Sequence, residues 1–99
     1  MSPAAKARTL PRPFNYHWGS GQIVEEAAYS GQHHEPAIQL LQYDEGEASG
    51  GWSIRFCFYN PRGHFQRSPL VIGDDELKGL RAALKKTPKL RRLLKRLVE

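Results

Sequence analysis

Three arginines interrupt the most apolar stretch of the chain, residues 54–73, and are the side chains there best suited to chemistry. Arg55 lies within a run of β-branched and aromatic residues, Arg62 lies in the turn that follows, and Arg67 lies on the return. Side chains alternate between the faces of a strand, so Arg55 and Tyr59 share one face. Cations interleaved with rings suit single-stranded nucleic acid, because guanidinium groups track phosphates and rings stack on bases.

The predicted site follows from this pattern. The predicted nucleic-acid contacts are Arg55, Arg62 and Arg67 to phosphates, Tyr59 as a stacking ring, and Trp52 and His64 as further contacts. The other interpretation of the same face is a solvated surface on which arginine stems cover apolar neighbours.

Charge is unevenly distributed along the 99 residues. The whole chain has 15 Lys and Arg against 10 Asp and Glu, a net charge of +5. Residues 1–50 contain three basic and six acidic side chains, whereas residues 51–99 contain twelve basic and four acidic ones. Such segregation favours a binding face over a role in solubility alone.

The sequence lacks the motifs that are typical of several classes of function. The sequence has no nucleophile motif, phosphate-binding loop or His-Glu-x-x-His pattern, so we expect no enzyme. The four histidines and the single cysteine, Cys57, lack zinc-site spacing, so we expect no metal and no other cofactor. No apolar run approaches the roughly 20 residues of a bilayer helix, and a lone cysteine fits a reducing compartment. We therefore expect no membrane partner and a cytoplasmic location, the nucleoid included.

The elements that position these residues predict an α+β fold. Four strands are expected, in the order ββββα, over residues 22–30, 36–43, 52–59 and 64–72. A turn at residues 60–63 makes the last pair antiparallel. Residues 1–13 are predicted to be a flexible basic tail, and residues 14–99 a single domain of sheet and helix.

Leucine spacing defines the C-terminal part. A helix is expected to begin at Asp74 as its cap, and Thr87-Pro88 is expected to end it and start a short basic helix. We expect the first helix to cover the face of Ile54 and Phe56, which leaves the face of Arg55 open. The basic helix could dock on the body or on a second copy, contact phosphates, or lie on an anionic membrane surface.

The segment Phe14–Trp18 contains three aromatic side chains in five residues. One interpretation is a plug that covers a sheet edge or a dimer seam. The other is a platform on which bases stack.

The run from Ser53 to Gly63, the return strand and a helix that opens with Leu77 and Leu80 three residues apart resemble the transcriptional coactivator positive cofactor four family. The sequence is equally similar to related sheet-and-helix single-strand binders such as the Whirly and Pur proteins. The resemblance covers residues 22–86 in element order and 53–80 in residues, and it places Arg55 on a strand arginine of the family. It implies a ββββα protomer, a homodimer built through the helices, and single-stranded DNA across the sheets.

Together these observations predict a homodimeric protein that binds single-stranded nucleic acid, DNA rather than RNA, in a role related to transcription. The alternative is a protein-interaction module that binds an acidic partner through the sheet face or the basic helix.

Overall fold

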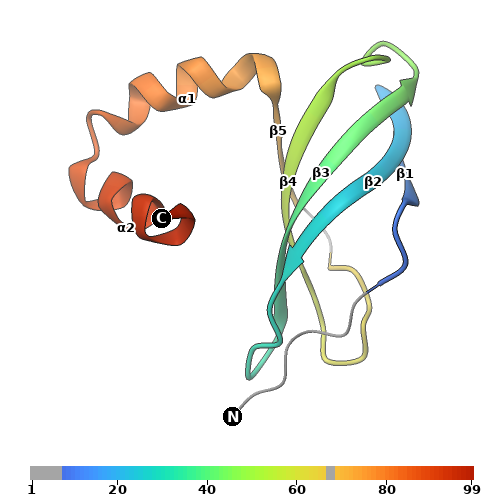
Figure 1. The fold of residues 1–99 in the computed structure, drawn as a ribbon, viewed down its shortest axis with the longest axis horizontal. Coiled ribbons are helices and arrows are strands. Elements are labelled where there is room, and N and C mark those ends of the chain that lie inside the picture. The colour runs from blue at the N-terminus through green and yellow to red at the C-terminus, as the bar shows by residue number, and fades with distance from the viewer. Residues whose placement is uncertain (1–7, 67–68) are drawn as a thin grey trace.

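The computed structural model describes residues 8–66 and 69–99, which form one antiparallel sheet followed by helices (Figure 1). Neighbouring strands are joined in chain order, so the sheet is a meander. The strands are β1 Arg12–Tyr16, β2 Gly19–Ala28, β3 Glu35–Glu45, β4 Trp52–Tyr59 and β5 Leu70–Gly73. A 3-10 turn at Asp74–Glu76 leads into α1 Leu77–Leu84, and α2 spans Pro88–Val98. The predicted α+β class and the C-terminal helices are thereby confirmed.

The sheet has five strands, so the prediction of four was wrong. The additional strand is β1, which pairs with β2 in a register that places Phe14 opposite Gly21. Phe14 is buried and meets the ring of Tyr43 edge-on, with 5.0 Å between ring centroids. An aromatic segment with this much surface to bury gains more by joining the sheet than by remaining in solvent. β1 begins at Arg12, inside the segment that the sequence assigned to a tail.

The hairpin after β4 has the predicted turn chemistry. The Gly63 N–H donates to the Asn60 carbonyl at 2.8 Å, and Gly63 has a φ of +85°, which glycine adopts readily. The return is less regular than expected. A single bridge joins Tyr59 to Phe65, and β5 begins only after Pro69, which has no N–H to donate to a neighbouring strand.

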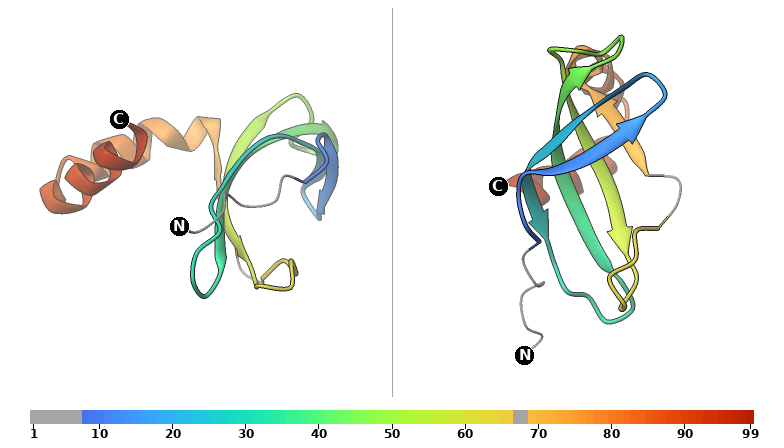
Figure 2. Two further views of the ribbon diagram at one scale, coloured as in Figure 1. Left: turned by 60° about the horizontal axis from the view of Figure 1, so that its bottom comes forward. Right: turned by 90° about the vertical axis from the view of Figure 1, so that its right-hand side faces the viewer.

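The sheet has two faces with different environments. The Arg55 face consists of the buried side chains Phe14, Ile23, Ala37, Gln39, Leu41, Tyr43, Ser53, Arg55, Cys57 and Tyr59. The Phe56 face carries Ile38, Leu40, Ile54, Phe56 and Phe58. The sheet curves strongly, so that β1 lies over the Arg55 face (Figure 2). A hydrogen bond from Arg55 to Tyr16 joins β4 to β1, although two strands separate them in the sheet.

The alternation of side chains along β4 is as predicted, but the prediction of which face is covered was wrong. The Arg55 face forms the core because β1 and the segment before it fold over it. On the other face, Phe58 remains 43% exposed in the single chain. Leu77 and Leu80, which were expected to cover that face, are each 43% exposed as well.

The two helices are separated at Thr87-Pro88, as predicted, with Pro88 as the first residue of α2. The cap at the start differs from the expectation, because Gly73 rather than Asp74 precedes the first turn. The Gly73 N–H donates to the Glu76 carboxylate at 2.9 Å, which satisfies one backbone donor. Among the described residues, no helix is long and apolar enough to cross a membrane.

Candidate nucleic-acid interface

Arg55 lies in the core of the molecule rather than on an open face. The residue is 6% exposed. Its Nε donates to Gln39 Oε1 at 2.6 Å, and one terminal nitrogen donates to the Tyr16 hydroxyl at 3.0 Å. The guanidinium also lies over the Phe65 ring, 4.7 Å from its centroid. A phosphate could reach this group only if its present partners moved away.

Arg55 is the end of a polar ladder, which we define as Glu26, Gln39 and Arg55, directly opposite one another on β2, β3 and β4. Gln39 is 1% exposed and is the centre of this ladder. Its Nε2 donates to Glu26 Oε2 at 2.6 Å and to the Tyr59 hydroxyl at 2.9 Å, while its Oε1 accepts from Arg55. No buried side-chain polar atom among the described residues lacks a partner, so the ladder meets the requirement for placing charge in a core.

An ion pair from β1 completes this network. Arg12 donates to both carboxylate oxygens of Glu26, at 2.7 and 3.2 Å, and to the Tyr59 hydroxyl at 3.1 Å. Burial of the Glu26 carboxyl would raise its pKa, but the hydrogen bonds from Arg12 and Gln39 outweigh burial and lower the pKa below its ordinary value. Burial would lower the pKa of Arg12, whereas its bonds to Glu26 and Tyr59 raise it. Both groups are thus held in their charged forms.

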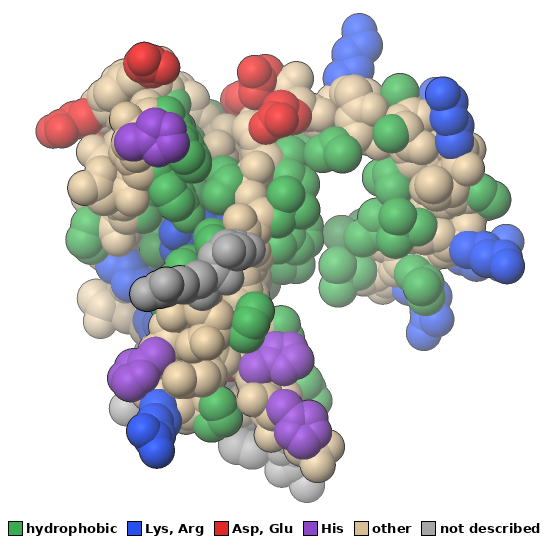
Figure 3. All heavy atoms as spheres, turned by 180° about the vertical axis from the view of Figure 1, so that it is seen from behind, with side chains coloured by type: hydrophobic (Ala, Val, Ile, Leu, Met, Phe, Trp, Pro, Cys, Tyr) green, Lys and Arg blue, Asp and Glu red, His purple; other side chains and the backbone are tan. Residues whose placement is uncertain are grey.

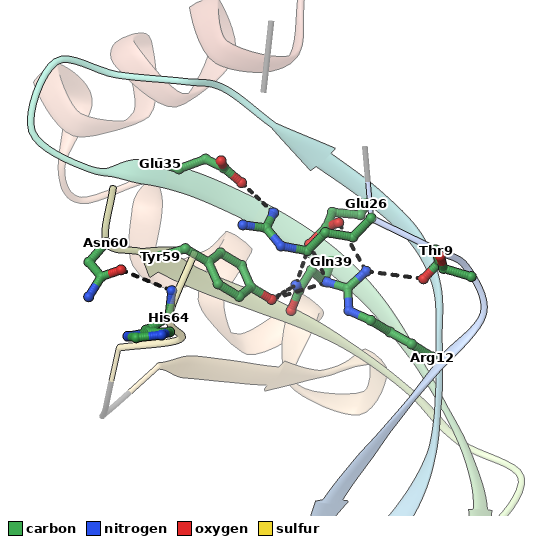
Figure 4. Close-up of polar contacts among 9 residues, drawn as sticks. Thr9, Arg12, Glu26, Glu35, Gln39, Tyr59, Asn60 and His64 are labelled. Carbon is green, nitrogen blue, oxygen red and sulfur yellow. Dashed lines mark hydrogen bonds and ion pairs between the residues drawn. The ribbon is translucent and has the colours of Figure 1, made fainter. Parts of the chain in front are cut away.

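The side chain of Tyr59 is enclosed by its neighbours, so its ring has no free face on which a base could stack. It is 6% exposed, and its hydroxyl points into the cluster formed by Gln39 and Arg12 (Figure 4). The guanidinium of Arg8, which also pairs with Glu35, lies 3.7 Å from the centroid of the Tyr59 ring. The Phe65 ring packs at 5.5 Å. Tyr59 therefore helps to close the core and does not offer a stacking surface in this conformation.

Two of the predicted contacts lie in the turn after β4. Arg62 and His64 are both exposed, and their backbone N–H groups donate to Asn60 Oδ1 at 3.0 and 2.9 Å. This side-chain cap fixes the turn and leaves both side chains in solvent. Arg67 lies outside the described residues. In residues 8–66 and 69–99, no three His, Cys, Asp or Glu side chains are grouped so that they could hold a metal ion.

Trp52 is separated from the other predicted contacts by the length of β4. It begins the strand and is 39% exposed, whereas the turn with Arg62 follows the other end. Eight residues of strand place these ends about 23 Å apart. Of the predicted site residues, the structure thus brings Arg55 to Tyr59 and Arg62 to His64, but it does not join Trp52 to either pair.

The exposed cations are concentrated on α1 and α2, which we call the basic hairpin. Its exposed basic residues are Lys78, Arg81, Lys85, Lys86, Lys89, Arg91, Arg92, Lys95 and Arg96. Glu99 is the one acidic residue after Leu77, and it lies 4.0 Å from Lys95 in an exposed pair. Such pairs contribute little, so the cations remain available to a ligand.

The acidic side chains gather elsewhere, at what we call the acidic end. It comprises the turn after β3 and the 3-10 turn, with Asp44, Glu45, Glu47, Asp74, Asp75 and Glu76. Figure 3 shows red side chains gathered at one end of the sheet, whereas several blue side chains project from the helices and others lie on the sheet away from that end. The opposite end of the sheet, the loop end, is formed by residues 29–34 and 60–66 and carries exposed histidines, Arg62 and Phe65 (Figure 1).

An apolar groove lies between the basic hairpin and the Phe56 face. One part, of about 520 Å³, is lined by Ile54 and Phe56 of the sheet and by Leu94, Leu97 and Val98 of α2, and the charged residues Arg91, Lys95 and Glu99 also border it. A neighbouring part, of about 550 Å³, continues toward Phe58. Leu97 is 59% exposed and Val98 79% exposed, so these leucine-rich surfaces are incompletely covered within one chain.

Sequence reasoning did not find four residues of the network: Arg8, Arg12, Glu26 and Gln39. Glu26 and Gln39 occupy inward positions of their strands, and a polar residue at such a position is the signal that was missed. Arg8 and Arg12 were assigned to a tail because prolines surround them, and only the register of β1 reveals their partners. No protein-family model, curated protein or solved structure matches this chain, so the family resemblance rests on the residues quoted for it.

Proposed function

We propose that this chain binds single-stranded nucleic acid, DNA rather than RNA, as a homodimer, with phosphates held by the basic hairpin and Arg62. The observation that carries the proposal is the hairpin's exposed charge, nine cations against the single acid Glu99. A polyanion whose phosphates are neutralised by such a surface releases its bound counterions into solution, so its affinity depends steeply on salt. Arg55 and Tyr59, enclosed in the core, support the fold and do not contact the ligand.

Exposed rings near cations support a preference for single strands. At the loop end, Phe65 is 41% exposed, between the exposed turn with Arg62 and His64 and the start of β5. Tyr29, at the same end, is 60% exposed. Unpaired bases can stack on such rings at about 1–3 kcal/mol each, whereas bases within a duplex cannot reach them.

The apolar groove supports a second copy as the partner. Monomeric proteins rarely expose contiguous apolar patches larger than a few hundred Å². Here Leu94 and Leu97 of α2 line a groove with Phe56, and Leu97 also lines its continuation toward Phe58. A dimer that buries these surfaces would join two basic hairpins and double the positive surface that a strand encounters.

A second function is favoured by the same groove. An amphipathic α2 with uncovered leucines could instead bind a different, acidic protein, with the cations steering its approach. In that case affinity for nucleic acid would be weak and would not depend on strandedness.

The test is fluorescence anisotropy of a labelled 20-nucleotide single strand and of a matched duplex, at 50 and 200 mM salt. We expect tighter binding to the single strand and a loss of affinity with salt, since log K falls with a slope of about −0.7 per phosphate neutralised. The double variant Lys89→Glu/Arg92→Glu should weaken binding at least tenfold, and Arg62→Glu should weaken it less. Arg55→Glu would test folding instead, because it places a carboxylate in the core.

The control is Glu47→Lys, which raises the net charge by two at the exposed acidic end, whereas the hairpin double variant lowers it by four. If the control strengthens binding by half as much, on a logarithmic scale, as the hairpin variant weakens it, net charge rather than the hairpin determines affinity. Equal affinity for single strand and duplex would refute the proposal and favour the protein-interaction module.

The dimer is tested separately by light scattering coupled to size-exclusion chromatography. Leu97→Asp, in the groove, should shift the protein to the mass of one chain. Arg96→Asp, at the neighbouring exposed position, should not. A wild type that elutes as a single chain at all concentrations would exclude the homodimer.

A further inference from the structure

A second groove lies at the acidic end, beside the start of α1, and has a different chemistry. It has a volume of about 740 Å³ and is lined by aromatic rings and by the 3-10 turn. Both tryptophans of the chain, Trp18 and Trp52, line it, whereas no Lys or Arg of residues 8–66 and 69–99 does. We call it the aromatic-acidic groove.

Its rings are held in place by their neighbours. Tyr16 and Trp18 stack almost in parallel, with 4.5 Å between centroids and 3° between planes. Trp18 Nε1 donates to the buried Tyr43 hydroxyl at 3.2 Å, which fixes the indole. Trp52, from the start of β4, is 39% exposed, so part of its surface is free to contact a ligand. A ring face attracts cations because its π system carries a negative quadrupole.

Polar groups without partners complete the lining. Ser53 is only 6% exposed, lines the groove, and has no side-chain hydrogen bond within the described parts of the chain. Asp74 and Asp75 are exposed and form no ion pair within residues 8–66 and 69–99, whereas the Glu76 carboxylate already accepts from Gly73. The groove thus presents the solvent-accessible hydroxyl of a largely buried serine and two carboxylates without ion pairs, beside rings fixed by their neighbours.

We propose that the aromatic-acidic groove binds an organic cation that carries an alkyl stem, such as the guanidinium of an arginine side chain. The rings would contact the flat cation, the carboxylates of Asp74 and Asp75 would pair with its charge, and the Ser53 hydroxyl would accept from an N–H group. A phosphate would be repelled by these same carboxylates, so this site is independent of the proposed nucleic-acid surface.

The test uses tryptophan fluorescence, which reports on this groove because both tryptophans line it. The full chain is titrated with N-acetyl-arginine amide and, as an isosteric neutral probe, N-acetyl-citrulline amide. We expect a saturable change with the arginine compound, at on the order of millimolar concentration for so small a ligand, and none with the citrulline compound. Tetramethylammonium and an Ac-Gly-Arg-Gly-amide peptide distinguish the source of the cation. Tighter binding of the peptide indicates a protein side chain, and equal binding indicates a small cation.

The double variant Asp74→Asn/Asp75→Asn should weaken binding of N-acetyl-arginine amide at least fivefold. The matched control Asp44→Asn/Glu47→Gln removes two charges from the same acidic end but outside the groove, and should change affinity less than twofold. Equal effects of the two double variants would overturn the proposal, because the overall negative charge of the acidic end would then explain binding. So would equal binding of citrulline, no saturable change, or a fluorescence response to single nucleotides but not to arginine.

Discussion

Replacing Gln39 by leucine tests whether the polar ladder holds the sheet together. The side chain makes three hydrogen bonds, two of them with the charged groups of Glu26 and Arg55 and one with the Tyr59 hydroxyl. Leucine has nearly the same volume and removes all three, so the change isolates the polar contribution.

The expected loss can be worked from these contacts. Hydrogen bonds to charged partners contribute about 1.5–3 kcal/mol each and a neutral one about 1 kcal/mol, so the gross loss is about 5 kcal/mol. Burial of the apolar isobutyl group of leucine offsets about 1–2 kcal/mol of this loss. The free energy of unfolding should therefore fall by about 3 kcal/mol, a large share of the 5–15 kcal/mol that is usual for a domain.

Urea denaturation followed by tryptophan fluorescence and circular dichroism, at a fixed protein concentration, measures this change. At a slope of about 1.5 kcal/mol per molar urea, the midpoint should move down by about 2 M. Gln42→Leu is the matched control, because Gln42 lies on the same strand but is exposed and should change stability by less than about 0.5 kcal/mol. A loss below 1 kcal/mol for Gln39→Leu, or equal losses for both variants, would refute the reasoning, since an open Arg55 face predicts that outcome.

Three further predictions concern single positions. The pKa of Glu26 is lowered in the folded protein, so its ionised form contributes stability that is present above the unfolded-state pKa of about 4.3 and is lost as pH falls through the folded-state pKa. Between pH 6 and 3, the urea midpoint should therefore fall more steeply for wild type than for Glu26→Gln. Parallel curves for the two proteins would contradict this. Burial raises the pKa of the Cys57 thiol, so a disulfide reagent at pH 7.5 should label it many times faster in urea than in buffer, unless the native thiol is accessible. A Cβ at Gly21 would lie 1.9 Å from the Gln42 carbonyl oxygen, so Gly21→Ala should lower the melting temperature by at least about 10 °C. The control Gly79→Ala, in the open interior of α1, should raise the melting temperature slightly. Equal melting temperatures of the two variants would count against the close approach of β2 and β3.

Local patterns predicted the elements well because local chemistry decides them. β4 has the bounds that its β-branched and aromatic residues indicated, and the break at Thr87-Pro88 follows from a proline that cannot continue a helix. Alternation also assigned Arg55 and Phe56 to opposite faces. What alternation cannot give is which face points inward, and the more apolar face of β4 is the one left partly exposed in the single chain.

The contacts that decide which face points inward join residues that are far apart in sequence. Arg12 reaches Tyr59 across 47 positions, and Tyr16 reaches Arg55 across 39. They form because the curved sheet brings β1 over β4, and β2 and β3 change register at two places, between Ser20 and Gly21 and between Ile23 and Glu25, as in strands that bend at bulges. A Cβ at Gly21 would lie 1.9 Å from the Gln42 carbonyl oxygen, so a side chain there would move the neighbouring strand. Nothing in the spacing of the arginines indicates this curvature, so the sequence singled out Arg55 but did not reveal its burial or its hydrogen bonds to Gln39 and Tyr16.

The curvature of the sheet also determines which charged side chains remain free to bind ligands. Arg8 and Arg12 pair with Glu35 and Glu26, and Arg55 is enclosed, so among the described residues of the sheet and its loops Arg62 is the arginine that remains free. The basic hairpin retains its cations, and the acidic end retains its carboxylates at the other end of the sheet from Arg62. A polyanion and an organic cation would therefore be attracted to different parts of one small molecule. Since a Debye length at physiological salt is only about 8 Å and the ends of β4 lie about 23 Å apart, charge changes at the acidic end should leave binding at Arg62 nearly unaffected.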